Sequence, residues 1–512
     1  MAQKVDEFDN FPQSYPLNCN RKMSYQRKTK IVATIGPASE SPEMLTKLAQ
    51  AGANIFRLNF SHGTHEDHLQ RVKNIRAVSE ALGTNLTILQ DLQGPKIRTQ
   101  LVENNGVELI PGKTLTFVMD ENVVGTSERV GTTYTSMYLD VVPGERILMD
   151  DGNLEVKVLT VDKEKKEVVT EVIYGGILKS KKGINLPGTK VSLPCLTPKD
   201  EADLYFGLDN GVDWVALSFV RKADDIYDIK QKIAAYGKDT KVIAKIEKPE
   251  AIDNLDEIIA ATDGIMVARG DLGVEMDGAE VPHLQRVMVE KCTQAGKPVI
   301  VATQMLESMI SNPVPTRAET SDVANAVLQG ASATMLSAES ASGAYPVKAV
   351  ETMAHIQEVV EEQQNKIEIV KGDEAAIYFK NHSLSNNNSK YPLNDRMIAS
   401  ACRLARDTKA EAILCITNSG YTAFRLSAHR PKANLYVFTS NKAIMTVMGL
   451  LWGAKVFYYE ADGKDVEATV NGMTDILVEK GLLAKGDTYV TTLSVPSNKD
   501  LKTNTVQLGV VE

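Results

Sequence analysis

The chain has 512 residues, of which 43% are hydrophobic and 24% are charged, and its formal net charge is −9. This composition is that of a globular protein with a sizeable core. An acidic chain offers no basic face to a phosphate backbone, so we expect no nucleic-acid partner. No apolar stretch reaches the roughly 20 residues of a membrane span, so we expect no membrane either.

The first 27 residues are predicted to form an irregular N-terminal arm. They lack the charged and apolar regions of a signal peptide, which favours a cytoplasmic protein. The cysteines are scattered without the paired spacing of zinc or redox sites, so we interpret them as reduced thiols. These five residues are Cys19, Cys195, Cys292, Cys402 and Cys415.

From residue 28 onward, apolar strands alternate with segments of helical periodicity. Eight such units with short links predict a (β/α)8 TIM barrel over 28–94 and 195–366, because an open sheet would need two distinct edge strands. The predicted strands are Lys30–Gly36, Asn54–Phe60, Leu86–Leu92, Trp214–Val220, Val242–Glu247, Gly264–Gly270, Pro298–Gln304 and Ala333–Glu339.

Residues 95–194 interrupt the barrel after its third strand. Alternating runs such as Thr114–Phe117 and Glu167–Val172, separated by Pro-Gly and Asp-Gly turns, predict a small antiparallel β-barrel domain. Inserted at the catalytic end of the barrel, this domain is expected to act as a lid.

Residues 367–512 are predicted to form a C-terminal α/β regulatory domain. A long helix, Pro346–Gln364, precedes a polar loop around Asn381–Ser389. Apolar strands such as Ala412–Thr417 and Leu435–Thr439 then alternate with helical patterns.

Two consecutive strands of the predicted barrel end in ionisable residues. Lys245 and Glu247 close the fifth strand, and Asp271 follows the sixth. Parallel strands of a barrel place their carboxyl ends on one rim, so these side chains are expected to meet there. Two carboxylates suit Mg²⁺ or Mn²⁺. A buried Lys245–Glu247 ion pair is the simpler alternative for a single Lys-x-Glu.

Other strand ends add cations, hydroxyls and amides to the same rim. Free amides are expected after Gly270, at a helix N-terminus. Phosphoryl transfer needs this combination of a divalent metal and cations around the migrating group. The residues are Arg57, Asn59, Ser61, His62, Asp91, Lys96, Arg98 and Thr303.

Along nearly its whole length the sequence resembles the pyruvate kinases. The resemblance implies Mg²⁺-dependent phosphoryl transfer from phosphoenolpyruvate to ADP, giving pyruvate and ATP in the final step of glycolysis, by a homotetramer. The segments that carry it are Val242–Ile252, Arg57–Gly63, Gly94–Arg98, Ala268–Gly273, Ala302–Ser308 and Pro315–Glu319.

The resemblance also implies roles for single residues. Glu247 and Asp271 would hold the metal, and Lys245 would stabilise the migrating phosphoryl group and the enolate. Amides near Gly270 and Asp271, with the Thr303 hydroxyl, would hold the substrate carboxylate.

The resemblance also implies which residues would contact the phosphates and the nucleotide. Arg57 and Arg98 would flank the phosphates, while Asn59 and His62 would face the nucleotide. Lys182 and Asp151 would reach in from the lid, although Asp151, in an Asp-Gly sequence, is equally well interpreted as a turn residue.

The family's potassium site is altered in this chain. Many members have an acidic residue where Lys96 stands, although the other cation ligands, Asn59, Ser61 and Asp91 with Leu92 beside them, remain. A lysine ammonium can replace the charge of a bound cation and repel that cation. We therefore expect turnover that does not require K⁺.

A phosphate-binding loop is predicted in the C-terminal domain at Thr417, Asn418, Ser419, Gly420, Tyr421 and Thr422. It joins a strand to a helix, where hydroxyls and amides can cradle a phosphate. In the family this is the effector loop, so a phosphorylated sugar or nucleotide is a candidate effector, and the alternative is that the protein has no effector. A simple cap and turn is the alternative. The later loop Val495–Asn504 lacks the arginine and glycine run of members regulated by a bisphosphate sugar.

The sequence is open to three further interpretations. His62, His65 and His68 could suggest zinc, but we expect His65 and His68 to be exposed in the first turns of a helix. A metal-dependent lyase or aldolase could share the rim residues, yet the inserted domain and Arg57 with Arg98 favour a nucleotide. A non-catalytic phosphosugar sensor would be expected to lack one of the rim residues, and all remain.

Overall fold

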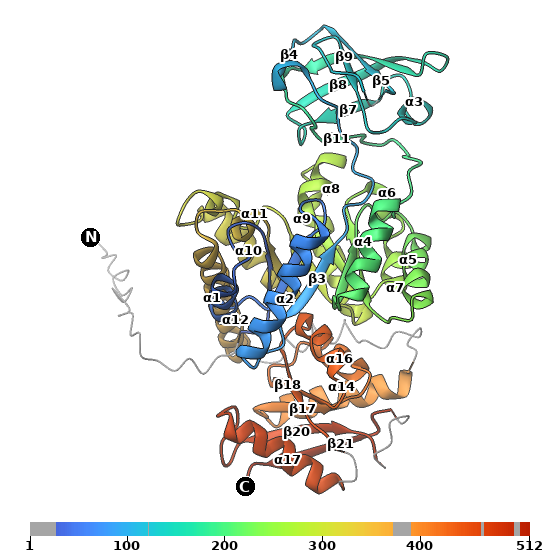
Figure 1. Cartoon of the computed structure of the whole chain (residues 1–512). Coiled ribbons are helices and arrows are strands. Elements are labelled where there is room, and N and C mark those ends of the chain that lie inside the picture. The colour runs from blue at the N-terminus through green and yellow to red at the C-terminus, as the bar shows by residue number, and fades with distance from the viewer. Residues whose placement is uncertain (1–26, 121, 372–390, 462–464, 496–501) are drawn as a thin grey trace, which may run out of the picture.

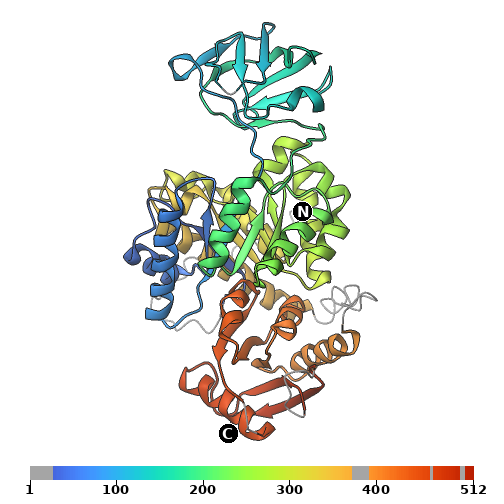
Figure 2. The ribbon, with the colours of Figure 1, turned by 45° about the vertical axis from the view of Figure 1, so that its right-hand side comes forward.

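The computed structural model describes residues 27–120, 122–371, 391–461, 465–495 and 502–512. Three bodies follow one another along the molecule: a strand-rich domain, a central barrel and a C-terminal domain (Figures 1 and 2). The predicted arm before residue 27, the loop Asn381–Ser389 and residues 496–501 of the loop Val495–Asn504 lie outside the described residues.

The central body is a closed barrel of eight parallel strands, which confirms the predicted fold class. β3 is paired directly with β12, although the whole inserted domain separates them in sequence. The strands are β1 (Lys30–Thr34), β2 (Ile55–Asn59), β3 (Thr87–Asp91), β12 (Trp214–Leu217), β13 (Lys241–Ile246), β14 (Gly264–Ala268), β15 (Val299–Ala302) and β16 (Ala333–Leu336).

Helices surround these strands, and several begin with capping boxes. Thr197 accepts from the Asp200 amide, and the Asp200 side chain accepts from the Thr197 amide in return. Thr316 and Glu319 do the same, so the motif Pro315–Glu319 forms a helix start. The helices are α1 (Pro42–Ala51), α2 (His65–Ala81), α4 (Pro198–Asp209), α5 (Ala223–Ala235), α6 (Pro249–Asp253), α7 (Leu255–Ala261), α8 (Arg269–Glu275), α9 (Val281–Ala295), η2 (Glu307–Ile310), α10 (Arg317–Gln329), α11 (Ala338–Ala341) and α12 (Pro346–Lys371).

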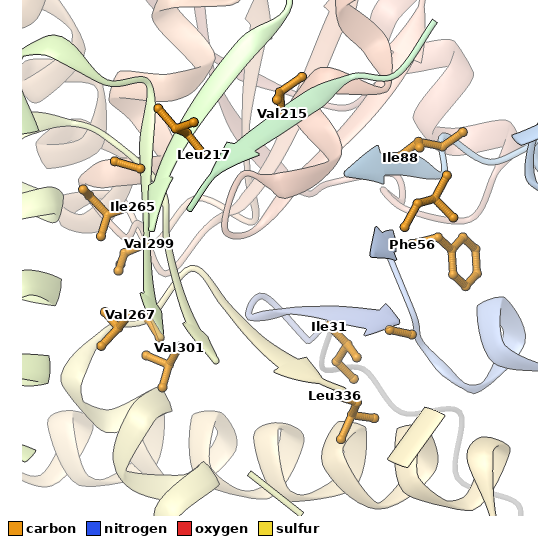
Figure 3. Packing of buried hydrophobic residues seen from close by; sticks show 14 of the residues in the cluster. Ile31, Phe56, Ile88, Val215, Leu217, Ile265, Val267, Val299, Val301 and Leu336 are labelled. Atoms are coloured by element: carbon orange, nitrogen blue, oxygen red, sulfur yellow. The ribbon is translucent and has the colours of Figure 1, made fainter. Parts of the chain in front are cut away.

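Side chains along each barrel strand alternate between two cores. Residues such as Val215 and Leu217 belong to the core beneath the helices (Figure 3). Trp214 and Ala216, on the same strand, fill the barrel interior. This period of two fixes which residues of each strand can reach the rim from inside the barrel.

The inserted domain consists of a six-stranded sheet in the order β11-β7-β8-β9-β5-β6 and a two-stranded sheet of β10 and β4. Its own core includes Phe117, Ile147 and Val156. The elements are η1 (Glu103–Asn105), β4 (Val107–Leu109), β5 (Thr114–Val118), β6 (Arg129–Gly131), α3 (Met137–Asp140), β7 (Arg146–Met149), β8 (Leu154–Asp162), β9 (Glu167–Tyr174), β10 (Gly176–Leu178) and β11 (Ile184–Asn185).

The C-terminal domain has a five-stranded sheet in the order β19-β18-β17-β20-β21, in which only β21 runs antiparallel to its neighbour. Its elements are α14 (Pro392–Asp407), β17 (Ala412–Ile416), α15 (Tyr421–Ala428), β18 (Asn434–Thr439), α16 (Lys442–Met445), η3 (Val447–Leu450), β19 (Ala454–Tyr458), α17 (Val466–Glu479), β20 (Thr488–Leu493) and β21 (Thr505–Val510).

This domain packs against the face formed by the N-terminal ends of the barrel strands. Leu450 is part of the interior barrel core, and Phe424 and Val447 pack against it. The Trp214 indole donates to the Val447 carbonyl at 3.0 Å. The inserted domain lies at the opposite face, where the strands end (Figure 1). The rim residues therefore lie between the barrel and the inserted domain.

Candidate functional site

Inward-facing residues at the C-terminal ends of the strands form a compact set of charges. The alternation that points Ile243 into the barrel interior also points Lys245 and Glu247 inward. Register sets Arg57 beside Leu89 and Asn59 beside Asp91 on neighbouring strands. The rim predicted from the order of the strands is therefore present as one structural layer.

Four of these residues, here called the charge cluster, are buried or partly buried and joined by ion pairs: Arg57, Asp91, Lys245 and Glu247. Arg57 Nε lies 2.6 Å from Asp91 Oδ2. Lys245 Nζ lies 3.2 Å from Asp91 Oδ1 and 2.9 Å from Glu247 Oε1. The Lys245–Glu247 pair expected as the simpler alternative is present, but within a larger network.

Burial and pairing set the protonation of the cluster. Burial alone would lower the pKa of Lys245, but the carboxylates of Asp91 and Glu247 raise it above the ordinary value, so the side chain stays cationic. Burial raises the pKa of Glu247, with Lys245 opposing and Asp271 reinforcing the shift. Positive charge added near Glu247 and Asp271 would therefore stabilise the charged form of the Glu247 carboxylate.

Glu247 and Asp271 are the pair that could hold a metal. Asp271 lies on α8, directly after β14, and interacts electrostatically with both Lys245 and Glu247. Oxygen donors and excess negative charge fit a hard divalent cation. In the described part of the chain, no group of three or more His, Cys, Asp and Glu side chains could enclose a metal by itself. The pair therefore fits an ion that takes further ligands from water or substrate.

A strained turn after β15 brings Thr303 to the start of α8. Thr303 and Gln304 have φ values of 66° and 55°, which are unusual for residues other than glycine. Thr303 Oγ1 accepts from the Gly270 amide at 2.8 Å and donates to the Ala302 carbonyl at 2.6 Å. The Gly270 amide that the sequence predicted to be free is thus bonded to Thr303.

Positive charge extends from the charge cluster toward the inserted domain. Burial lowers the pKa of His62, and the positive charges of Arg98, Lys96 and Arg57 lower it further. Arg98 donates to the Lys181 carbonyl at 3.1 Å. This arrangement suits polyanionic phosphates entering between the barrel and the inserted domain.

Lys96 also approaches the inserted domain. Its Cε lies 3.8 Å from the position that a Cβ on Gly183 would occupy. Gly183 forms a bridge with Arg98. Lys96 and Arg98 therefore both lie where the chain leaves the barrel.

The predicted monovalent-cation ligands already have partners within the protein. Asn59 Oδ1 accepts from the Ser61 amide at 3.1 Å. The Leu92 carbonyl accepts from the Ser218 hydroxyl at 2.7 Å. Asp91 belongs to the charge cluster.

The inserted domain contributes Lys182, which forms an ion pair with Asp150 and not with Asp151. Lys182 Nζ lies 2.6 Å from Asp150 Oδ1. Asp150 and Asp151 both have left-handed backbone conformations, with φ of 55° and 56°, and Asp151 is exposed. This geometry is that of the Asp-Gly turn given as the alternative for Asp151.

The prediction that His68 is exposed is wrong. Its side chain is buried and stacks on Phe60, with ring centroids 3.9 Å apart, and burial lowers its pKa to about 4. Its Nε2 lies 2.9 Å from the His62 carbonyl oxygen. His65 is half-buried and lies 2.7 Å from Asp203. Aromatic packing that the helical pattern did not reveal explains both placements.

The predicted effector loop joins β17 to α15 in the C-terminal domain. Thr417 Oγ1 accepts from the Gly420 amide at 3.1 Å, and the Thr422 hydroxyl lies 2.8 Å from that of Thr503. Asn418 and Ser419 are exposed. The turn expected as part of the alternative is therefore present, with an exposed tip, but α15, whose N-cap residue is Gly420, has no side-chain cap.

Sequence reasoning missed the end of the fourth strand. Ser218 Oγ accepts from Lys245 Nζ at 2.6 Å, and the Phe219 amide donates to Glu247 Oε2 at 2.7 Å. Ser218 continues the inward alternation of Trp214 and Ala216, which was the available signal. A Ser-Phe sequence by itself does not indicate a functional site, so these two residues were not predicted.

A closed barrel with charged side chains at the C-terminal ends of its strands is typical of enzymes. The family described as "Pyruvate kinase, barrel domain" matches residues 26–350, and "Pyruvate kinase, alpha/beta domain" matches residues 395–508. The chain belongs to the pyruvate kinase family, and it is a kinase. This membership sets aside the lyase, aldolase and sensor alternatives.

Individual relatives agree with the family match. A pyruvate kinase from Geobacillus stearothermophilus is 44% identical over 490 residues, covering 95% of this chain and 81% of the relative. One from Bacillus licheniformis is 44% identical over 471 residues, covering 91% and 77%. A crystal structure of a pyruvate kinase from Cryptosporidium parvum matches with a TM-score of 0.87 at 34% identity, over 95% of this chain and 96% of that one.

Among the helices of the described residues, none combines the length and apolar character required to cross a bilayer.

Proposed function

We propose that the protein transfers the phosphoryl group of phosphoenolpyruvate to ADP, giving pyruvate and ATP, with Mg²⁺ or Mn²⁺ held by Glu247 and Asp271. The observation that carries the proposal is the buried Lys245 ammonium between Asp91 and Glu247. When bound, the metal would neutralise charge on the phosphoryl oxygens.

Different residues of the rim would act on different groups of the substrates. Lys245 would donate to the phosphoryl group as its bond to the enol oxygen breaks and a bond to the terminal ADP oxygen forms. It would then stabilise the enolate, which takes a proton at carbon to become pyruvate. The Thr303 hydroxyl and the amides near Gly270 and Asp271 would orient the substrate carboxylate. Fixed charges of this kind cost no reorganisation during transfer.

Arg57 and Arg98 would contact phosphates, and Asn59 and His62 would face the nucleotide. Lys182 and Asp151 would reach these groups when the inserted domain moves toward the rim. The basic surroundings of His62 support this assignment, because the lowered pKa keeps the imidazole neutral beside the cations.

A coupled assay tests the reaction. Pyruvate formation is measured from phosphoenolpyruvate and ADP, with and without Mg²⁺. Turnover that requires both substrates and the metal is expected. Turnover that persists after chelation of divalent cations would contradict the metal assignment.

We infer further that turnover does not require K⁺. In this proposal the Lys96 ammonium replaces the charge of a bound cation. Two observations support it: Lys96 contributes to the positive charge near His62, and hydrogen bonds within the protein already engage the Asn59 side chain and the Leu92 carbonyl. Activity is compared in K⁺ and Na⁺ at constant ionic strength. The wild type should respond equally to both, whereas Lys96→Glu should become dependent on K⁺. A strong preference of the wild type for K⁺ would refute the inference.

We also propose that the loop Thr417–Thr422 binds a phosphorylated sugar or nucleotide. Its exposed Asn418 and Ser419 precede α15, where helix amides favour anions. An effector that lowers the KM for phosphoenolpyruvate in the wild type should fail in Ser419→Glu, because the new carboxylate repels phosphate. Unchanged activation in that variant would place the effector elsewhere.

The family further suggests a cytoplasmic homotetramer that performs the last step of glycolysis. Closed symmetry is the usual form of soluble homo-oligomers. Light scattering at assay concentration should give the mass of four chains, and a monomer would contradict this part of the proposal.

A further inference from the structure

Phe219, directly after β12, adopts a backbone conformation that aromatic residues rarely take. Its φ is 57°, in the left-handed region. Such strain persists where surrounding contacts over-determine it. The contacts of Ser218 and Phe219, here called the β12 corner, therefore indicate what the strain maintains.

On one side, the β12 corner holds two members of the charge cluster. Ser218 Oγ accepts from Lys245 Nζ at 2.6 Å while donating to the Leu92 carbonyl at 2.7 Å. The Phe219 amide donates to Glu247 Oε2 at 2.7 Å. The ammonium and the carboxylate are thus both positioned by consecutive residues of one turn.

On its other side, the β12 corner contacts the first segment that joins the barrel to the inserted domain. Gly94, in that segment, has φ of +70° and packs directly against the corner. A Cβ on Gly94 would lie 2.6 Å from Phe219 Cδ2 and 2.8 Å from Ser218 Cβ. No side chain fits there without displacing the corner.

The second connecting segment returns to the same corner. Cys195 Sγ donates to the Phe219 carbonyl at 2.8 Å. Arg221, two residues farther on, donates to the Val191 carbonyl and, at 2.7 Å, to the Leu193 carbonyl. Both connections of the inserted domain therefore end on the turn that holds Lys245 and Glu247.

We propose that Ser218 and Phe219 are positioning residues that couple the two connections of the inserted domain to the placement of Lys245 and Glu247. A displacement of either connection moves the Phe219 amide and the Ser218 hydroxyl. Because these two groups are hydrogen-bonded to the Glu247 carboxylate and the Lys245 ammonium, the carboxylate and the ammonium move with them. The inference rests on the proposed function, because it assigns Glu247 to the metal and Lys245 to the phosphoryl group.

Gly94→Ala tests the coupling, with Gly211→Ala as its matched control. Both glycines have nearly the same left-handed backbone conformation, with φ of +70° and +67°, so alanine introduces similar backbone strain at each, but a Cβ on Gly211 would have no atom within 4 Å. Turnover is measured, and the affinity for Mn²⁺ alone is measured by electron paramagnetic resonance. Circular dichroism shows whether both variants fold.

Gly94→Ala should lower kcat at least tenfold and raise the Mn²⁺ dissociation constant at least threefold. Gly211→Ala should keep both within twofold of the wild type. A folded Gly94→Ala with wild-type turnover and Mn²⁺ affinity would overturn the inference, as would a loss of turnover with unchanged Mn²⁺ affinity. Absence of turnover in the wild type would contradict the proposed function itself.

Ser218→Ala provides an independent arm if Gly94→Ala does not fold. It removes the hydroxyl that accepts from Lys245 without adding volume and leaves Asp91 and Glu247 in place, so kcat should fall about tenfold while the KM for phosphoenolpyruvate changes less than threefold. Equal kcat in Ser218→Ala and the wild type would show that the corner does not position Lys245.

Discussion

The two faces of the barrel use the same strands for opposite purposes. At the C-terminal face, strand ends supply a network of charges in which Arg57 and Asp91 are buried and the Lys245 side chain is 12% exposed. At the N-terminal face, interior residues such as Trp214 meet Leu450 of the C-terminal domain in an apolar core. Buried charges are costly and rarely increase stability over apolar packing. The contrast indicates that one face is built for chemistry and the other for docking a domain.

The largest expected effect is at the charged face. Lys245→Met removes the only cation that lies between Asp91 and Glu247 among the ion pairs of the described residues, and with it the charge proposed to stabilise the transferred group. Turnover should fall about 100-fold or more, as for other preorganised electrostatic groups. Steady-state kinetics of phosphoenolpyruvate and ADP measure it.

Lys222→Met is the control for that variant. Lys222 follows the same strand, β12, but its side chain is 56% exposed. It should retain turnover within about twofold, since exposed ion pairs contribute little. Near-normal turnover in Lys245→Met would show that the charge cluster does not have the proposed chemical role.

Leu450→Ala is the matching change at the apolar face. Leu450 is 1% exposed, so the truncation should lower the free energy of unfolding by about 2–5 kcal/mol through lost burial and a cavity. Urea unfolding measures this loss, and kcat at 25 °C should change less than twofold. A large fall in kcat with intact stability would show that the two faces do not have separate purposes.

The pH dependence of stability offers a weaker test of the apolar face. Burial, and then the nearby Arg27, lowers the pKa of Lys30 to about 7, with Glu361 opposing and Lys455 adding to the shift. Lys30 Nζ also donates to the Ala454 carbonyl at 2.8 Å. The unfolded state therefore binds more protons between pH 7 and about 10.5, and stability should rise with pH in that window.

Lys30→Met removes this titration. Unfolding measured for both proteins at several pH values between 7 and 10 should show a smaller rise with pH in the variant. Equal slopes would indicate that Lys30 stays protonated in the folded protein.

The smallest expected effect concerns a single contact between the charged face and the inserted domain. Asn185 Nδ2 donates to Glu275 Oε1 at 2.8 Å, and Lys248 pairs with the same carboxylate at 2.7 Å. Asn185→Ala should raise the KM for phosphoenolpyruvate about two- to tenfold, the equivalent of one net hydrogen bond. Asn153→Ala, in an exposed turn of the same domain, should leave KM unchanged. Identical KM values in both variants would show that the Asn185 contact has no part in binding.

Local pattern alone was sufficient for the architecture of this protein. Apolar runs of Val and Ile and helical spacing between them are short-range properties, and they specified the barrel strands, the inserted domain and the C-terminal sheet. The period of two along β13 likewise implied that Lys245 and Glu247 share a side of the strand. Short polar signals such as Thr197 and Asp200 determined where helices begin.

Only the tertiary structure decided which groups meet across strands and domains. Nothing local distinguishes Asp150 from Asp151 as the partner of Lys182, because strand pairing between β7 and β11 sets that contact. His68 is buried by Phe60, a residue from another element. Phe219 takes its strained conformation because Glu247 and both connections of the inserted domain converge on it, and convergence of distant segments is a property that no stretch of sequence contains.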